Sequence, residues 1–392
     1  MRLIAVTSKS DIKAFHKLPF YIYKDDPNWI PHLKQDVEAV FDPAQNKFFR
    51  HGEAIRWILI DNKGKIVGRV AAFINNKTAK SFQQPTGSMG FFECINDTKV
   101  AFMLFDACKS WLEEREMKAM DGPINFGEKD KFWGLIINNF NAPPYYGQNY
   151  NPEYYVRFFE EYGFRIYYKQ LIYSRNVYDP LQEKYVVRAE RIFSNPDYKT
   201  CSIEKKNLAK YAEDFRTIYN RAWAIHDNFK SMSKIQAMSI MKKMKPILDE
   251  DIIWFAYYES RPIGFFVQLP ELNEIFKKLK GNLNWFGKLK FFFYQKTGKC
   301  KTSFGVAFGI DPDFQGKGVE GAIFKALEQR IYPKKKYYNL IITWIGDFNP
   351  KMIRIIENLG CKRFRDMATY RKIFDPRIKF QRSPIIGTGK KA

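Results

Sequence analysis

The stretch FGIDPDFQGKGVEGAIFKAL, residues 308–327, decides how the chain folds. It begins inside an apolar run that is typical of a buried strand, and Asp311-Pro312 ends that run. Gly316 and Gly318 follow, and the apolar residues after them recur at the spacing of an amphipathic helix. The pattern therefore predicts a strand that enters a tight glycine loop and continues directly into a helix.

This loop is suited to binding a phosphate group. Glycine adopts positive φ angles readily, so Gly316 and Gly318 allow successive backbone N–H groups to point toward one place. That place lies at the N-terminus of the predicted helix, where unpaired amides and the helix dipole attract anions, and Lys317 adds a charge. A turn that only caps a helix has the same glycines, so the loop alone leaves both interpretations open.

The elements around the loop indicate an α/β fold in which helices pack on a mixed sheet. Apolar and aromatic runs between turn residues predict the strands, and Gly360 is placed to end the last helix. The predicted elements are a strand at 199–203, two helices, strands at 252–258, 263–269, 303–310 and 339–345, a helix from Asn349 to Leu359, and a terminal strand pair within 361–374.

The first half of the chain repeats this order in weaker form. It has a first strand, a helix from Asp11, a hairpin, a further strand and a helix, and both halves close on similar sequences around Gly163 and Gly360. Its strand-to-helix junction has no glycine loop. We therefore predict two domains, 1–180 without a diphosphate loop and 196–376 with one, followed by a flexible basic tail at 377–392.

Composition limits the classes of function. Of the 392 residues 45% are hydrophobic, and the formal net charge is +23, which favours anionic ligands but not specifically nucleic acid. No apolar stretch reaches the length of a membrane-spanning helix and the start does not resemble a signal peptide, so we expect a cytoplasmic protein. Five scattered cysteines and four histidines show no metal-ligand spacing, so no metal is expected.

The loop resembles the cofactor motif of the GNAT acyltransferase superfamily, Q/R-x-x-G-x-G/A. Gln315, Gly316, Lys317 and Gly318 fit its first four positions. Glu320 stands where the family has glycine or alanine, and Gly321 follows one place later.

A second feature of the superfamily is an asparagine that opens a helix ending in Leu-Gly-Phe. Here it corresponds to Asn349 and Leu359-Gly360-Cys361. The whole chain resembles a bacterial subgroup with two GNAT-like halves. The residues that carry this resemblance are Trp344, Asp347, Asn349, Met352, Tyr370 and Arg371.

The resemblance implies a fold of two tandem GNAT-like domains and an acyl-CoA-dependent N-acyltransferase. Acetyl-CoA or a longer acyl-CoA would donate the acyl group to a primary amine, which is a small molecule or a lipid-like amine. The pantetheine arm would pair with backbone groups of a splayed strand. The implied cofactor-binding residues are Phe308, Ile310, Gln315, Gly316, Lys317, Gly318, Gly321 and Asn349.

The catalytic residues are less well defined. Many members of the superfamily have a tyrosine seven residues after the helix-opening asparagine, where this chain has Ile356, so Tyr370 or a water would supply the acid. Asp347 is the candidate base, with helix capping as the alternative. The acceptor pocket is predicted at Trp223, His226, Asp227 and Trp344, for which packing is the alternative.

An insertion at 275–301 has eight lysines, no acidic residue and many aromatic residues. It is compatible with an anionic membrane surface, with an acidic acyl carrier protein, or with a hairpin or lid whose aromatic residues face inward.

Two alternatives to the acyl-CoA-dependent transferase also stay open. The first is an enzyme of the same fold that uses acyl carrier protein or aminoacyl-tRNA as donor, and the second is a catalytically inactive ligand-binding protein.

Overall fold

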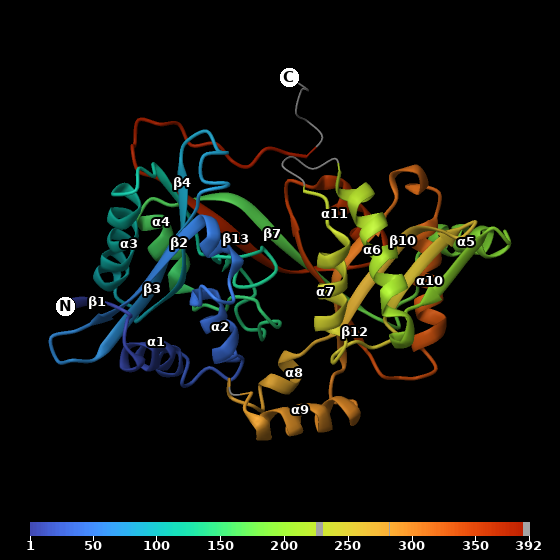
Figure 1. Ribbon diagram of the computed structural model, residues 1–392, viewed down its shortest axis with the longest axis horizontal. Coiled ribbons are helices and arrows are strands. Elements are labelled where there is room, and N and C mark those ends of the chain that lie inside the picture. The colour runs from blue at the N-terminus through green and yellow to red at the C-terminus, as the bar shows by residue number, and fades with distance from the viewer. Residues whose placement is uncertain (225–229, 282, 387–392) are drawn as a thin grey trace.

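The computed structural model describes residues 1–224, 230–281 and 283–386 (Figure 1). The strands are β1 (Arg2–Ala5), β2 (Gly52–Ile60), β3 (Ile66–Asn75), β4 (Thr86–Cys94), β5 (Ala119–Gly122), β6 (Leu135–Ile136), β7 (Arg165–Asn176), β8 (Tyr198–Ser202), β9 (Ile253–Tyr258), β10 (Arg261–Pro270), β11 (Thr302–Ile310), β12 (Asn339–Gly346) and β13 (Lys362–Ile373). The α-helices are α1 (Lys9–Ile22), α2 (Lys34–Phe41), α3 (Thr98–Glu113), α4 (Tyr154–Glu161), α5 (Glu183–Phe193), α6 (Leu208–Trp223), α7 (Lys234–Met244), α8 (Asn273–Phe276), α9 (Trp285–Lys296), α10 (Val319–Ile331) and α11 (Pro350–Asn358).

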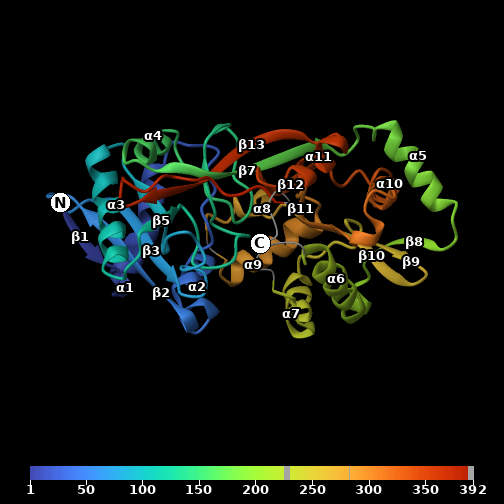
Figure 2. The same ribbon diagram turned by 90° about the horizontal axis from the view of Figure 1, so that it is seen from above.

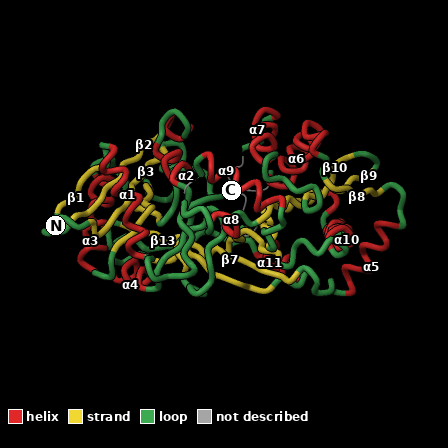
Figure 3. Tube along the Cα trace, turned by 90° about the horizontal axis from the view of Figure 1, so that it is seen from below, coloured by secondary structure: helices red, strands yellow, loops and turns green. Residues whose placement is uncertain are grey.

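All strands of the described residues belong to one mixed sheet that runs through both halves. Their order is β1-β2-β3-β4-β5-β13-β7-β12-β11-β10-β9-β8, with β6 paired to β13. The neighbours β4/β5 and β11/β12 are parallel. In the second half α6 and α7 cover one face of the sheet, and α5 and α10 cover the other (Figure 2 and Figure 3).

The two halves contain the same strand–helix–strand unit. In the first half β4, α3 and β5 form it, and in the second half β11, α10 and β12 do. The apolar stripe predicted for the second helix is buried as expected, at Val319, Ile323, Phe324, Leu327 and Ile331. The sequence predicted all three elements of this unit in the second half, but only the strand and the helix in the first, where β5 was not predicted.

The last strands of the two halves, β7 and β13, exchange places in the sheet. Strand β13, the last of the chain, lies between β5 and β7 of the first half, and β7 pairs on its other side with β12. Arg371 of β13 binds Asp121 of β5 in a buried ion pair, with Nε–Oδ1 and Nη2–Oδ2 distances of 2.6 and 2.8 Å. The terminal strand pair predicted within 361–374 is thus wrong, because one continuous strand forms there. The domains 1–180 and 196–376 stay a prediction.

The segment after β13 is described as far as residue 386, and the flexibility predicted for 377–392 stays a prediction. It runs back along β7, where the Ser383 amide donates to the Tyr167 carbonyl at 3.0 Å. The Ile386 amide donates to the Phe348 carbonyl at 2.8 Å. These backbone hydrogen bonds fix the segment on the sheet. None of the described helices is both long and apolar enough to cross a membrane.

Candidate active site

The glycine loop has the backbone geometry that the sequence predicts. Gly316 has φ of 76° and Gly318 has φ of 97°, both in the region that favours glycine. A short 3₁₀ turn, Pro312–Phe314, leads from β11 into the loop, and α10 begins directly after Gly318. Gly318 is the N-cap and no side chain caps the helix, so the first amides of α10 are free to bind a ligand.

Asp311 fixes the end of β11 where the loop begins. Its buried carboxylate binds Arg221 Nε at 2.6 Å and Arg261 Nη2 at 2.8 Å. Burial alone would raise the pKa of Asp311, but hydrogen bonds from Arg261 and Arg221 lower it overall. The ionised carboxylate therefore ties the loop to α6 and β10.

Helix α5 supplies two further cations beside the loop. A Cβ atom added to Gly318 would lie 2.9 Å from Arg188 Cβ, and Arg191 Nη2 donates to the Lys317 carbonyl at 3.1 Å. Both arginines are exposed, so they can contact an anion bound at the loop. Sequence reasoning missed them, although their i, i+3 spacing places both on one face of a helix.

The two residues that depart from the GNAT motif pack toward α5. Glu320 is buried in the first turn of α10. The pKa of Tyr185 on α5 is raised by the burial of the tyrosine itself and by the charge of Glu320. A Cβ atom on Gly321 would lie 3.0 Å from the Tyr185 carbonyl oxygen. Gly321, predicted to bind the cofactor, therefore also allows α5 and α10 to approach each other closely.

Strands β11 and β12 separate toward the loop. They pair only from Thr302 with Asn339 to Gly305 with Ile342. Beyond Gly305, β11 continues paired to β10 alone, and β12 continues paired to β7 alone. The predicted splay is confirmed, and it leaves the side of β11 at 306–310 that faces β12 without a paired strand among the described residues. Phe308 and Ile310 lie on this edge.

Gln315 and Asn349 lie where the motif implies, but their side chains are already engaged. Gln315 Nε2 donates to the Ile310 carbonyl at 3.1 Å, and its Oε1 accepts from Lys351 Nζ at 2.5 Å. Asn349 caps α11 by accepting from the Met352 amide at 3.2 Å. The Gln315–Lys351 hydrogen bond brings the start of α11 next to the loop.

The predicted catalytic residues are not brought together at the loop. Tyr370 packs in the first-half core, where its hydroxyl contacts Glu160 Oε1 at 3.4 Å and burial raises its pKa. Asp347 pairs with Arg382 at 2.5 Å and does not cap α11. The structure does not support Tyr370 as the acid, since β13 carries it into the first half, and the Asp347 carboxylate is held by its arginine.

The two tryptophans predicted to bind the acceptor lie near the splay. Trp223 stacks on Tyr219, with ring centroids 4.6 Å apart, and covers Gly309 of β11, whose added Cβ would lie 2.8 Å from it. Trp344 donates from Nε1 to the Lys129 carbonyl of the first half at 3.1 Å. His226 and Asp227 lie outside the described residues.

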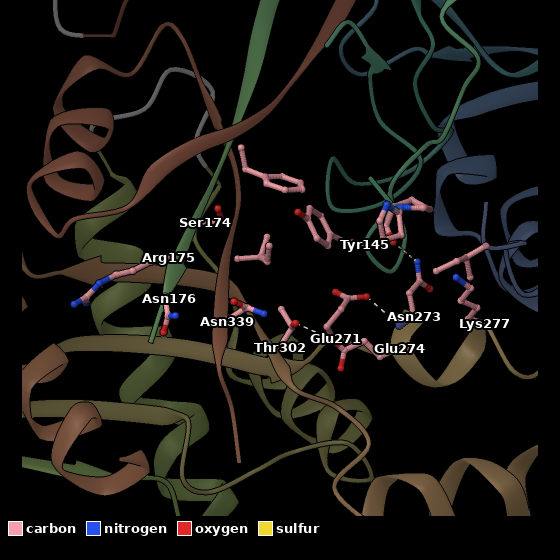
Figure 4. Close-up of a pocket in the computed structure, with 15 residues that line it drawn as sticks. Tyr145, Ser174, Arg175, Asn176, Glu271, Asn273, Glu274, Lys277, Thr302 and Asn339 are labelled. Atoms are coloured by element: carbon pink, nitrogen blue, oxygen red, sulfur yellow. Dashed lines mark hydrogen bonds between the residues drawn. The ribbon is translucent and has the colours of Figure 1, made fainter. Parts of the chain in front are cut away.

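A cavity of about 390 Å³ lies at the other end of the β11–β12 ladder, between the halves (Figure 4). Thr302 and Asn339, the first pair of that ladder, line it together with Tyr145 of the first half. The splay begins after Gly305, three residues along the strand and so about 10 Å away. Figure 4 shows Glu271, Thr302 and Asn339 around the space beneath Tyr145, whereas Arg175 points away.

Glu271 is the unusual group in this cavity, and sequence reasoning missed it. Its Oε1 accepts from the amides of Tyr146 and Asn273, each at 2.9 Å. Its buried Oε2 and the buried Tyr145 hydroxyl have no hydrogen-bond partner among the described residues. Burial raises the pKa of Glu271 to about 8, although the two amides lower it. A buried carboxyl that titrates near neutrality beside a cavity is typical of a functional site.

Comparison with known proteins identifies the fold. No model of a known protein family matches the sequence. Protein YghO of Escherichia coli strain K12 is 25% identical over 380 residues, 93% of each chain, and bacterial ceramide synthase of Caulobacter vibrioides is 26% identical over 384 residues, 95% of this chain and 97% of the relative. A solved tandem GNAT protein from the clavulanic acid biosynthesis pathway superposes with a TM-score of 0.54 at 8% identity, covering 96% of this chain and 99% of its own. The chain thus has the tandem GNAT fold that its motifs implied.

Proposed function

We propose that this chain, which has the tandem GNAT fold, is an acyl-CoA-dependent N-acyltransferase with its donor site in the second half. The observation that carries the proposal is the glycine loop at the end of the splayed strand, where Gly316 and Gly318 both have positive φ. The first half has no such loop, since Asp97 caps α3 with its own side chain. Its carboxylate accepts from the Lys99 amide at 2.8 Å. That helix N-terminus is closed to a diphosphate.

The donor would bind along the second-half loop and splay. The amides after Gly316 would hold the diphosphate, with Lys317, Arg188 and Arg191 adding positive charge. The pantetheine arm would lie against the free edge of β11 and present the thioester, which is an activated acyl group. Residues of the chain would thus orient the donor and expose its carbonyl carbon to the amine.

The acceptor would enter from the cavity between the halves. Its amine nitrogen attacks the thioester carbonyl, the carbon–sulfur bond breaks, CoA leaves as the thiolate and the nitrogen loses a proton. We assign Glu271 as the group that receives this proton, directly or through a water, because Glu271 lines the cavity, its Oε2 has no hydrogen-bond partner among the described residues and its pKa is about 8. It takes the place of Asp347, which is paired with Arg382.

A lipid-like amine is the acceptor class that the comparisons favour. One relative is named bacterial ceramide synthase, and a ceramide is an N-acylated long-chain amine. We also propose that the protein acts in the cytoplasm, as expected from the sequence, because an acyl-CoA donor is consistent with that compartment.

Thioester turnover tests this proposal. Purified protein is mixed with acetyl-CoA or a long-chain acyl-CoA and with small or long-chain amines, and released thiol and N-acylated product are measured. We expect amine-dependent release of CoA with one N-acyl product formed for each thiol. Turnover of only acyl carrier protein or aminoacyl-tRNA would replace the donor, and binding of acyl-CoA without turnover of any amine would leave an inactive ligand-binding protein.

A further inference from the structure

Helix α9 carries a stripe of large apolar side chains that face solvent. Trp285 is 67% exposed, Phe286 is 70% exposed and Phe293 is 63% exposed. Leu289 and Phe292 are exposed as well. Positions 285, 286, 289, 292 and 293 follow the helical repeat and lie on one face. An exposed patch of this kind on a soluble fold indicates a binding surface.

The other face of α9 is anchored to the protein, so the stripe has a fixed orientation. Phe291 is buried and stacks on Phe276 of α8 at 5.6 Å, and Phe276 in turn contacts Tyr146 of the first half at 5.3 Å. The Lys34 amide donates to the Gly281 carbonyl at 3.2 Å, which ties the insertion to the start of α2. Figure 1 shows α9 at the outer edge of the molecule, with α8 on its inner side.

The charge around the stripe has one sign. The segment 275–301 has eight lysines and no acidic residue. The lysines of this segment that are exposed include Lys277, Lys278, Lys280, Lys288, Lys290, Lys296 and Lys299. A helix with aromatic residues on one face and lysines beside it is typical of a segment that lies in the headgroup region of an anionic bilayer.

We propose that α9 docks the protein on the surface of an anionic lipid membrane. The stripe from Trp285 to Phe293 enters the boundary between headgroups and acyl chains, and the lysines contact lipid phosphates. Lys277 of the insertion and the nearby Asn273 of α8 line the cavity, so docking would bring that cavity close to the bilayer. A docked α9 would allow a lipid-like amine to reach the cavity without leaving the membrane.

Vesicle flotation of the full chain tests this proposal without any substrate, so its outcome is separate from that of the transferase proposal. The vesicles contain phosphatidylcholine alone or with phosphatidylglycerol. We expect binding to the anionic vesicles only, reduced about tenfold or more in Phe286→Ser/Phe293→Ser. The control Ile235→Ser removes an apolar side chain that is 83% exposed on α7, and it should bind as the unmodified protein does.

A pair of charge variants tests the lysines. Lys288→Glu/Lys290→Glu and the control Lys242→Glu/Lys243→Glu change the net charge equally, and all four lysines are exposed. Only the first variant should lose binding to anionic vesicles, and added salt should weaken binding of the unmodified protein. Equal losses in both variants would overturn the proposal.

Two other results would also overturn it. The first is a dimer in sedimentation that Phe286→Ser/Phe293→Ser converts to a monomer, which would assign the stripe to a second copy of the chain. The second is binding to an acidic acyl carrier protein with no binding to anionic vesicles. Unchanged thermal unfolding of each variant confirms that a lost interaction is not lost folding.

Discussion

Gly318 and Arg188 lie in direct contact, since a Cβ atom on Gly318 would lie only 2.9 Å from Arg188 Cβ. The contact joins the first turn of α10 to α5, two elements that lie on opposite sides of β8, β9, β10 and β11 in the sequence. It places the base of the Arg188 side chain beside the loop that we propose to bind the CoA diphosphate. The donor site is therefore built by tertiary packing as well as by the loop.

Arg188→Ala should weaken CoA binding. A hydrogen bond to a charged group contributes about 1.5–3 kcal/mol, so the dissociation constant should rise roughly ten- to a hundredfold. Calorimetric titration with CoA measures the change, and the effect should shrink in high salt. The matched control is Arg157→Ala on α4 of the first half, where the arginine lies 3.9 Å from Glu161. An equal affinity of both variants would contradict the role of α5.

Glu271→Gln should remove one step of the pH–rate profile. If Glu271 receives the proton, turnover of the unmodified enzyme rises with pH through about 8, where the carboxyl ionises. Glutamine cannot titrate, so the rise should vanish together with most activity. Glu274→Gln changes a carboxyl of the same segment and is the control. A profile that keeps its rise in Glu271→Gln would assign the base elsewhere.

The same carboxyl predicts how stability varies with pH. Its pKa is raised from 4.5 when unfolded to about 8 when folded, so between these values the folded state holds a proton that the unfolded state has lost. Its contribution to stability is therefore present below pH 4.5 and is lost as pH rises toward 8, with a slope of at most about 1.4 kcal/mol per pH unit. Denaturant unfolding at several pH values should show a smaller slope in Glu271→Gln. An identical slope would contradict the raised pKa.

Arg371→Met should destabilise the first half, although Arg371 belongs to the last strand. Removing one partner of a buried pair leaves Asp121 charged and unpaired, which costs about 3–5 kcal/mol. Amide exchange of β5 should accelerate, because β13 pairs with it. The control Arg377→Met breaks an exposed pair with Asp375 and should leave stability nearly unchanged, because solvent screens such a pair. Unchanged exchange in β5 would contradict the strand exchange.

The sequence predicted what depends on local pattern. The glycine loop could be found because Gly316 and Gly318 stand between an apolar strand and a striped helix, and each of these features is visible within a short window. The repeated strand and helix in the two halves were visible for the same reason, whereas the short strand β5 was not.

The sequence did not reveal contacts between distant segments. Alternation in 361–374 is the same whichever strands lie beside it, so neither the single strand β13 nor the first-half location of Tyr370 could be inferred. The surroundings of Arg188 arise because α5 packs against α10. Those of Glu271 arise because the two halves pack against each other. In the insertion, the buried Phe291 lies within a run of aromatic residues, so the sequence did not show which of these residues form the exposed face of the helix.

Calorimetric titration of the full chain and of Gly318→Val with CoA shows whether the glycine loop binds the donor. A valine disfavours the positive φ of this position, and its side chain would collide with Arg188. It should therefore distort the diphosphate loop. Gly298→Val is the control, since Gly298 also has positive φ but has open space around it. We expect one CoA site per chain in the unmodified protein and in the control, and none in Gly318→Val. Two sites per chain, or unchanged binding by Gly318→Val, would contradict it.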